Sequence, residues 1–232
     1  MLIQECRKHK IIIMVGYVLR FFRPLQVIKQ ALKEGKIGKI LSIQAAVGRY
    51  LPDWRPGMDY RKNVSAREDL GGGVVFELSH ELDYVRWLVG EIKEVNAATG
   101  RVGNFKIDVE DMAEITIIFK NKALGHIHLD MLDRAMNRGC RILGTEGTIA
   151  WNWFADQSHL VNWYSAQTKV WTPLLPSTPI DYNEMFIEEI QHFFNCVKEK
   201  KQPAVSLADG KRIVALALAI KRSAKDGKKI KV

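Results

Sequence analysis

The chain has 232 residues, of which 47% are hydrophobic, so it is long enough to bury a core as one large domain or two small ones. Its net charge of +9 would suit an anionic ligand, but the lysines are scattered and cluster only in RKHK and in the tail KDGKKIKV, which argues against nucleic-acid binding. No apolar run reaches the length of ~18 residues that a membrane span needs.

Three widely spaced cysteines, Cys6, Cys140 and Cys196, indicate neither a disulfide framework nor a zinc site. They are typical of a protein in a reducing cytoplasm. The basic start before IIIMVGYVL offers no small-x-small cleavage site, so we do not expect a signal peptide.

The N-terminal segment begins with MLIQECRKHK, which resembles the last turns of a helix. The run IIIMVGY that follows is continuously apolar, as in a buried parallel strand, although nothing before Met1 supplies such a strand with neighbours. Next comes PLQVIKQALKEGKIG, a predicted helix that starts at Pro24, carries Leu25, Ile28, Ala31 and Leu32 at helical spacing and stops at Gly35.

From Ile40 onward most of the chain is predicted to form strands with short links. The expected strands lie in KILSIQAAVGRY, IKEVNAATGRV, DMAEITIIFK, ALGHIHLDML, GCRILGT, GTIAWNW, SHLVNWYS and TKVWTPL. Two helices close the chain, and the first, YNEMFIEEIQHFFNCVKEK, places Phe186, Ile190, Phe193, Phe194 and Val197 on one face. This order predicts an α+β fold with a large, mostly antiparallel open sheet and helices on one face.

The stretch Gly71 to Gly90, GGGVVFELSHELDYVRWLVG, combines an unusual density of titratable groups with a large aliphatic surface. As one helix to about Leu88 it would pack an apolar stripe, Val75, Leu78, Leu82, Val85 and Leu88, on the sheet. The other face would carry Glu77, His80, Tyr84 and Trp87, with Asp83 beside them. Both acids lie within reach of His80 and would raise its pKa, which suits proton exchange with a substrate hydroxyl. The glycines would let a substrate or another backbone come close. A half-buried helix histidine with a neighbouring salt bridge is the alternative interpretation.

Two other groups of residues are weaker candidates. His126 and His128 are two residues apart on a predicted strand, so their side chains share a face. No third metal ligand follows at a spacing typical of a metal site, so we predict none. The aromatic series Trp151, Trp153, Trp163, Tyr164 and Trp171 would suit sugar stacking, sheet packing or a dimer interface.

Taken together, these segments resemble the glucose-fructose oxidoreductase, inositol dehydrogenase and rhizopine catabolism (Gfo/Idh/MocA) family over nearly the whole chain. The resemblance rests on VGYVLRFFRP with IKQALKEGKIGKI, the glycine-led stretch, VEDMAEITIIF, GTEGTIAW and the closing VSLADGKRIVALALAIKRSAKDGKKIKV, in this order. It implies a sugar, cyclitol or nucleotide-sugar oxidoreductase that uses NAD or NADP, with residues 1–22 as a remnant of the dinucleotide-binding (Rossmann) domain and residues 23–232 as the substrate-binding and oligomerisation domain.

The resemblance also assigns roles to individual residues. His80 matches the catalytic histidine, Asp83 matches the acid three residues after it, and Glu77 is the acid nearest to the family's aspartate, where this chain has Phe76. Arg20, Arg49, Tyr50 and Tyr84 are expected to contact substrate. A homodimer or homotetramer through the sheet is also implied.

The chain lacks GxGxxG and the family's Glu-Lys-Pro segment. A dinucleotide fold needs a glycine-rich turn to bring pyrophosphate onto a helix N-terminus, so we expect this chain alone to bind no NAD(P). The rival hypothesis is a non-enzymatic binding or assembly module that retains the family's sheet as a dimer interface.

Overall fold

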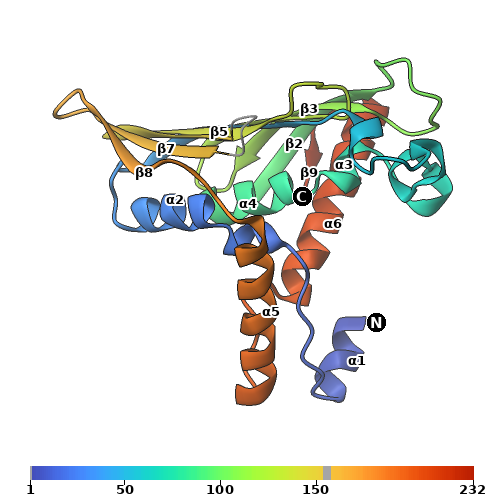
Figure 1. The fold of residues 1–232 in the computed structure, drawn as a ribbon, viewed down its shortest axis with the longest axis horizontal. Coiled ribbons are helices and arrows are strands. Elements are labelled where there is room, and N and C mark those ends of the chain that lie inside the picture. Colours follow the sequence, from blue (N-terminus) through green and yellow to red (C-terminus); the bar gives the residue numbers. More distant parts are fainter. Residues whose placement is uncertain (1, 154–157) are drawn as a thin grey trace.

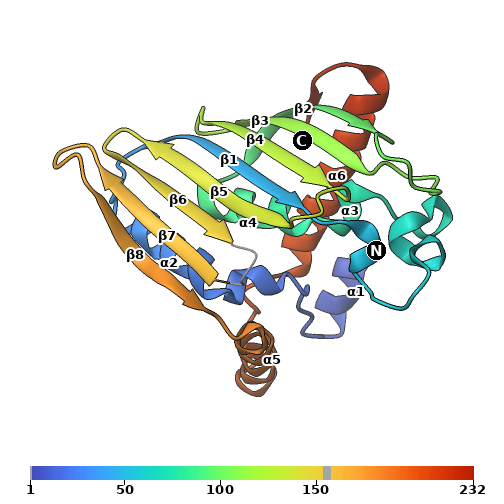
Figure 2. The ribbon, with the colours of Figure 1, turned by 45° about the horizontal axis from the view of Figure 1, so that its top comes forward.

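A nine-stranded sheet forms the body of the molecule in the computed structural model, which describes residues 2–153 and 158–232 (Figures 1 and 2). The strand order is β8-β7-β6-β5-β1-β4-β3-β2-β9. The strands are β1 (Ile40–Gly48), β2 (Ile92–Gly100), β3 (Met112–Phe119), β4 (Leu124–Asp130), β5 (Asn137–Gly144), β6 (Gly147–Trp153), β7 (Ser158–Ser165), β8 (Trp171–Pro179) and β9 (Ile230–Lys231).

All eight strands predicted from Ile40 onward are confirmed, and the sheet is mostly antiparallel as expected. Strand β1 is the exception, because it enters the middle of the sheet between β4, to which it is parallel, and β5, to which it is antiparallel. Strand β9 was not predicted. It lies in the basic C-terminal tail and extends the edge beside β2.

Side chains alternate across the sheet and separate a buried inner face from an open outer face. In β3, Ala113, Ile115, Ile117 and Phe119 are buried, whereas Glu114 between them is exposed. Period-two alternation of this kind is what allowed the strands to be predicted.

Helices cover only the inner face of the sheet (Figure 1). They are α2 (Arg23–Lys33), α3 (Val74–Glu77), α4 (His80–Val89) and α6 (Leu207–Asp226). As predicted, Pro24 stands in the first turn of α2, and Leu25, Ile28 and Ala31 are buried. The α+β architecture with helices on one face is therefore confirmed. Four short 3₁₀ helices fill the loop after β1, at Leu51–Asp53, Tyr60–Lys62, Val64–Ala66 and Glu68–Leu70.

The N-terminal segment differs from the prediction in one part. Helix α1 (Leu2–Lys8) is present, but the run IIIMVGY forms irregular chain with a single antiparallel bridge from Met14 to Ser206. The described residues give this run no parallel neighbour, and the Val15 N–H donates instead to the Val205 carbonyl at 3.1 Å. A 3₁₀ helix, η1 (Val18–Phe21), then leads into α2. The proposed domain boundary at residue 22 stays a prediction.

Helix α5 (Tyr182–Glu199) projects away from the sheet (Figures 1 and 2). Large apolar side chains along it are solvent-exposed, with exposed fractions of 46% for Phe186, 53% for Ile190, 65% for Phe194 and 47% for Val197. Four of the five residues predicted to share a face of this helix are thus exposed in the described chain. Exposed apolar side chains at helical spacing are typical of a surface that packs against another domain or subunit.

No helix within the described ranges combines the length and the apolar character that crossing a bilayer requires.

Candidate functional site

Three glycines allow the loop after β1 to pack tightly against the start of α3. A Cβ on Gly72 would lie 2.1 Å from the Val64 carbonyl oxygen, and one on Gly73 would lie 2.5 Å from Glu110 Oε1. Gly73 also has φ +107°, a conformation that L side chains rarely adopt. The expectation that the glycines admit another backbone is therefore confirmed at Gly72.

The glycine-led stretch forms two helices rather than the single one predicted. Helix α3 ends at Glu77, Leu78 leaves the helical region with φ −100° and ψ 27°, and α4 begins at His80. The break costs no core packing, because all five residues of the predicted apolar stripe are buried. It places His80 at the first residue of a new helix, beside the irregular chain from η1.

The His80 imidazole is partly buried, and its surroundings are aromatic and polar rather than acidic. The Tyr17 ring meets it edge-on, with centroids 5.5 Å apart, and the Tyr17 hydroxyl donates to Ser79 Oγ at 3.5 Å. His80 Nδ1 is buried and has no hydrogen-bond partner among the described residues. The Tyr17 ring thus packs against the imidazole, and the imidazole Nδ1 has no hydrogen-bond partner among the described residues.

Burial lowers the pKa of His80 to about 4, and the positive charge of Arg138 adds to this effect. The sequence-based prediction that carboxylates raise this pKa is wrong. Both candidate acids are engaged elsewhere: Glu77 Oε2 accepts a hydrogen bond of 2.6 Å from the Ser65 hydroxyl, and Asp83 is paired with Arg20. At neutral pH the imidazole is therefore uncharged and has an acceptor nitrogen.

Arg20 and Asp83 lie together in a buried ion pair. Arg20 Nε and Nη2 donate to the two carboxylate oxygens at 2.8 and 2.7 Å, and the side chains are 8% and 1% exposed. Burial raises the pKa of Asp83, against the opposing effect of Arg20. The pair joins η1 to α4 beside a second pair, in which Arg86 donates to Asp209 at 3.0 Å.

The other predicted substrate contacts lie in different surroundings. Arg49 is exposed, and Tyr50 stacks under the Arg134 guanidinium at 4.0 Å and accepts a hydrogen bond of 3.0 Å from it. Tyr84 is fully buried, edge-on to Trp151 at 6.1 Å. Their proposed roles in substrate binding, like those of His80, Glu77, Asp83 and Arg20, stay predictions.

Sequence reasoning did not select the residues that surround His80 most closely. Tyr17 lies in the apolar run IIIMVGY and Ser79 directly precedes His80, but neither residue belongs to a sequence pattern that indicates a functional role. Glu81, the residue after His80, is fully buried against Arg138, which comes from β5, 57 residues along the chain. A pairing across such a separation leaves no local pattern to find.

On the outer face of the sheet, His126 and His128 both contact Glu114, at 2.9 and 2.6 Å, and His128 Nε2 also contacts Asp130 at 2.9 Å. These carboxylates, with the Asp130 hydrogen bond as the largest contribution, raise the pKa of His128 to about 9. Within the described residues no group of three or more potential ligands is placed to hold a metal ion.

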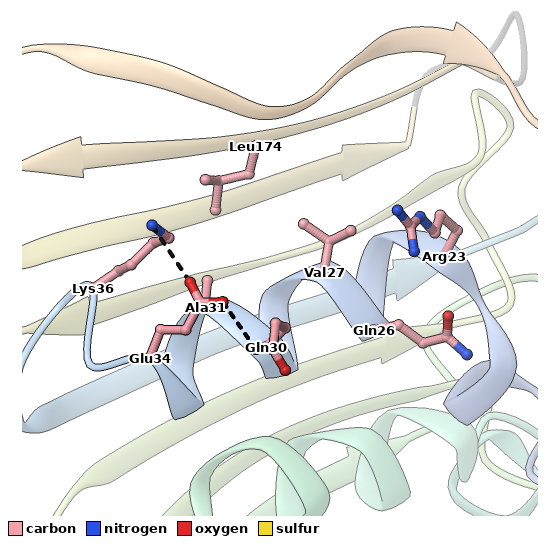
Figure 3. Close-up of a pocket in the computed structure, with 8 residues that line it drawn as sticks. All are labelled: Arg23, Gln26, Val27, Gln30, Ala31, Glu34, Lys36 and Leu174. Atoms are coloured by element: carbon pink, nitrogen blue, oxygen red, sulfur yellow. Dashed lines mark hydrogen bonds and ion pairs between the residues drawn. The ribbon is translucent and has the colours of Figure 1, made fainter.

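A surface groove of about 420 Å³ runs between α2 and β8 (Figure 3). Lys36 and Glu34 lie along it with Leu174 of β8, and Glu34 is already bridged to Lys36 at 3.5 Å and to Gln30 at 2.8 Å. None of the predicted site residues lines this groove. We therefore place the candidate site at His80, on its chemistry rather than on the size of a hollow.

A family model decides where the chain belongs. The model of the oxidoreductase family GFO_IDH_MocA, C-terminal alpha/beta domain, matches residues 29–232. The chain is a member of this family. The resemblance seen in the sequence is thereby confirmed.

Individual Gfo/Idh/MocA relatives are more distant. The chain is 28% identical to the myo-inositol 2-dehydrogenase of Thermotoga maritima, over all of this chain and 67% of that protein. It is also 28% identical to the levoglucosan dehydrogenase of Pseudarthrobacter phenanthrenivorans, over 92% of this chain and 65% of that protein. A solved levoglucosan dehydrogenase in complex with NADH and levoglucosan superposes with a TM-score of 0.82 at 25% identity, over 96% of this chain and 66% of that one. The chain thus spans about two thirds of the length of these relatives.

Proposed function

We propose that this chain is the substrate-binding part of an NAD(P)-dependent oxidoreductase that acts on a hydroxyl or carbonyl of a sugar, a cyclitol or a nucleotide sugar. The observation that carries the proposal is His80, an uncharged imidazole at the start of α4 with a buried, unpaired Nδ1. Family membership and the named activities of the relatives, on inositol and on levoglucosan, support the substrate class.

In this reaction, bound NAD(P) supplies the hydride acceptor. His80 takes the proton from the substrate hydroxyl while the carbinol hydrogen leaves as hydride, so an alcohol becomes a carbonyl and the imidazole becomes charged. A neutral histidine can accept this proton directly. The Tyr17 ring and the start of α4 hold the imidazole, and Arg20 with Asp83 secures the η1 segment that carries Tyr17 next to α4.

We further propose that a dinucleotide-binding domain packs against the exposed stripe of α5. About a third of the length of each of these relatives lies outside the part that this chain matches, and a solved levoglucosan dehydrogenase complex contains NADH. Phe186, Ile190, Phe194 and Val197 are exposed on α5. This helix extends from the inner side of the sheet, away from its outer face (Figure 1). An apolar stripe of this kind gains stability when a second domain covers it.

The test is a chimera in which the part of the Thermotoga maritima relative that this chain does not match precedes the chain. We expect the chimera to bind NADH at micromolar concentration, whereas the chain alone should show no saturable NADH fluorescence change up to about 1 mM. Turnover is then measured on a panel of sugars, inositols and nucleotide sugars. Micromolar binding by the chain alone would contradict the assignment of cofactor binding to another domain.

Replacing His80 by Ala in the active chimera should lower the maximal rate by about 10²- to 10⁴-fold, the usual contribution of a positioned acid or base, with little change in NADH affinity. Glu77→Gln should have a smaller effect. His126→Ala, on the other face of the sheet, is the matched control and should leave the rate unchanged. A His80→Ala rate within a factor of about three of the parent would show that catalysis does not use this helix.

The open outer face of the sheet supports a second candidate function, that of a non-enzymatic assembly module. Trp171, Leu124 and Leu143 are exposed on it, as in a surface that packs against another sheet. A chimera that binds NADH but turns over none of the panel, together with stable self-association of the chain, would favour this second function.

A further inference from the structure

A second buried ion pair, between Glu81 and Arg138, lies immediately beside His80 and has no part in the proton transfer described above. Arg138 Nε donates to Glu81 Oε1 at 2.7 Å and Nη2 donates to Oε2 at 2.9 Å. The Glu81 side chain is 0% exposed and that of Arg138 is 14% exposed. Burying two charges carries a large desolvation cost, so such a pair is weak evidence for a purely stabilising role.

The pair fixes the helix turn that presents His80. Glu81 is the second residue of α4, and Arg138 reaches it from β5 on the inner face of the sheet. The guanidinium is itself held in place, because it lies 5.7 Å from the Trp153 ring, which stacks on Tyr182 at 4.9 Å. A planar, two-pronged contact of this kind sets orientation as well as distance.

The charged groups on the elements packed around α4 single out Arg138. Arg20 of η1 is neutralised by Asp83, and Arg86 of α4 by Asp209 of α6 and by Glu91. Lys29 of α2 donates to the Trp87 carbonyl at the far end of α4 at 2.5 Å. Glu77 of α3 is bonded to Ser65, and Tyr17 is uncharged at neutral pH because burial raises its pKa. Of these groups, Arg138 is the one whose charge adds to burial in lowering the pKa of His80.

We propose that Arg138 is a positioning residue for His80: anchored by Glu81, it holds the first turn of α4 against β5 and thereby keeps the imidazole buried. The inference rests on the proposed function, in which His80 accepts the substrate proton. The step needs a neutral histidine, and burial of the imidazole, with a smaller contribution from the charge of Arg138, opposes protonation before substrate arrives.

The test follows the imidazole resonances of the isolated chain by NMR against pH, with His80→Gln used to assign His80 among the six histidines. Removing Arg138 alone would leave a buried carboxylate, so the main variant is Glu81→Gln with Arg138→Met, which removes both charges. Arg138→Lys keeps the charge. Arg141→Met is the matched control, because Arg141 lies on the same strand but near Trp171, on the outer face.

We expect the double variant to release this turn and to raise the proton affinity of His80 at least tenfold, because burial is the main cause of its lowered pKa. Arg138→Lys, which keeps the charge but cannot make the two-pronged contact, should raise the affinity by less, and Arg141→Met should stay within about twofold of the parent. Near-UV circular dichroism checks that each variant is folded. An unchanged midpoint in a folded double variant would overturn the proposal, as would a rise in Arg141→Met equal to that in the double variant.

This measurement needs neither cofactor nor turnover, so its outcome is separate from that of the chimera. If the chimera is inactive but the titration behaves as expected, the role of Arg138 stands and the enzymatic function falls. In an active chimera, the acid limb of the pH profile should move upward in the double variant by the same amount as the NMR midpoint.

Discussion

Arg20 and Asp83, 63 residues apart in the sequence, are joined by two charge-assisted hydrogen bonds of 2.8 and 2.7 Å. The pair connects η1, which leads out of the N-terminal segment, to the helix that begins with His80. Arg20 also donates to the Ala204 carbonyl at 3.2 Å and so reaches the turn before α6. One arginine thus ties together three segments that the proposed site needs.

Replacing Arg20 by Met should destabilise the chain by about 3–5 kcal/mol, because it leaves the Asp83 carboxylate buried without its partner. Adding Asp83→Asn should recover a large part of this loss, since the remaining buried group is then neutral. The free energy of unfolding is measured by urea denaturation. The exposed pair of Arg61 and Asp59 provides the control, and Arg61→Met should change the unfolding free energy far less. Equal losses at the two sites would contradict the structural role given to Arg20.

Gly73→Ala should destabilise the chain by at least about 1–3 kcal/mol, because the new Cβ meets Glu110 Oε1 at 2.5 Å and φ is +107°. Gly16→Ala is the matched control. A Cβ at Gly16 meets nothing within 4 Å, so this variant should lie within about 0.5 kcal/mol of the parent. Thermal unfolding followed by circular dichroism measures both. A Gly73→Ala variant as stable as Gly16→Ala would mean that the glycine-led turn relaxes freely.

The sequence predicted the fold well because the information for it is local. Alternation along β3 and the stripe of Leu25, Ile28 and Ala31 on α2 are each readable within ten residues or so. The strand predicted at IIIMVGY failed for the opposite reason. Apolar character indicates burial, but a strand also needs a partner, and the described chain gives this run only the Met14 bridge.

The environment of His80 could not be predicted from spacing. Glu77 and Asp83 are near His80 on an ideal helix, but the break at Leu78 and the partners Ser65 and Arg20 take both acids away. Burial of the imidazole, to which the charge of Arg138 from β5 adds, lowers its pKa where the spacing predicted a rise. Electrostatics at this site depends on tertiary pairing, which a single sequence does not record locally.

The chain should lose stability as pH rises from about 6.5 to 9, because His128 has a raised pKa, about 9, in the folded state. Below pH 6.5 His128 is charged in the folded and in the unfolded chain, and its bonds to Asp130 and Glu114 contribute fully to the free energy of unfolding. As the pH rises from 6.5 to 9, the unfolded chain releases this proton before the folded chain does, and the contribution, of order 1–3 kcal/mol, is lost.

Urea denaturation at pH 6, 7.5 and 9 measures this dependence. His128→Gln should flatten it, whereas His9→Gln, at an exposed histidine just after α1, should leave it unchanged. A parent chain whose stability does not fall over this range would show that solvent screens the cluster of His128, Glu114 and Asp130.

The outer face of the sheet is expected to mediate self-association into a dimer or tetramer. Leu124 and Leu143 flank Ser42 on neighbouring strands, and both are exposed, by 55% and 37%. Both lie on the outer face of the sheet, which no helix covers (Figure 2). A flat, uncovered sheet face of this kind is stabilised by packing on a symmetric copy.

Sedimentation at micromolar concentration should therefore detect a dimer or tetramer, and Leu124→Asp with Leu143→Asp should dissociate it, because four or more charges would enter the centre of a symmetric interface. Ile190→Asp with Phe194→Asp is the matched control. It introduces the same charges on the exposed stripe of α5, which is assigned to a different partner, and should leave the assembly intact. Dissociation by the α5 variant but not by the sheet variant would show that copies meet through the helix, and the outer face would then need another explanation.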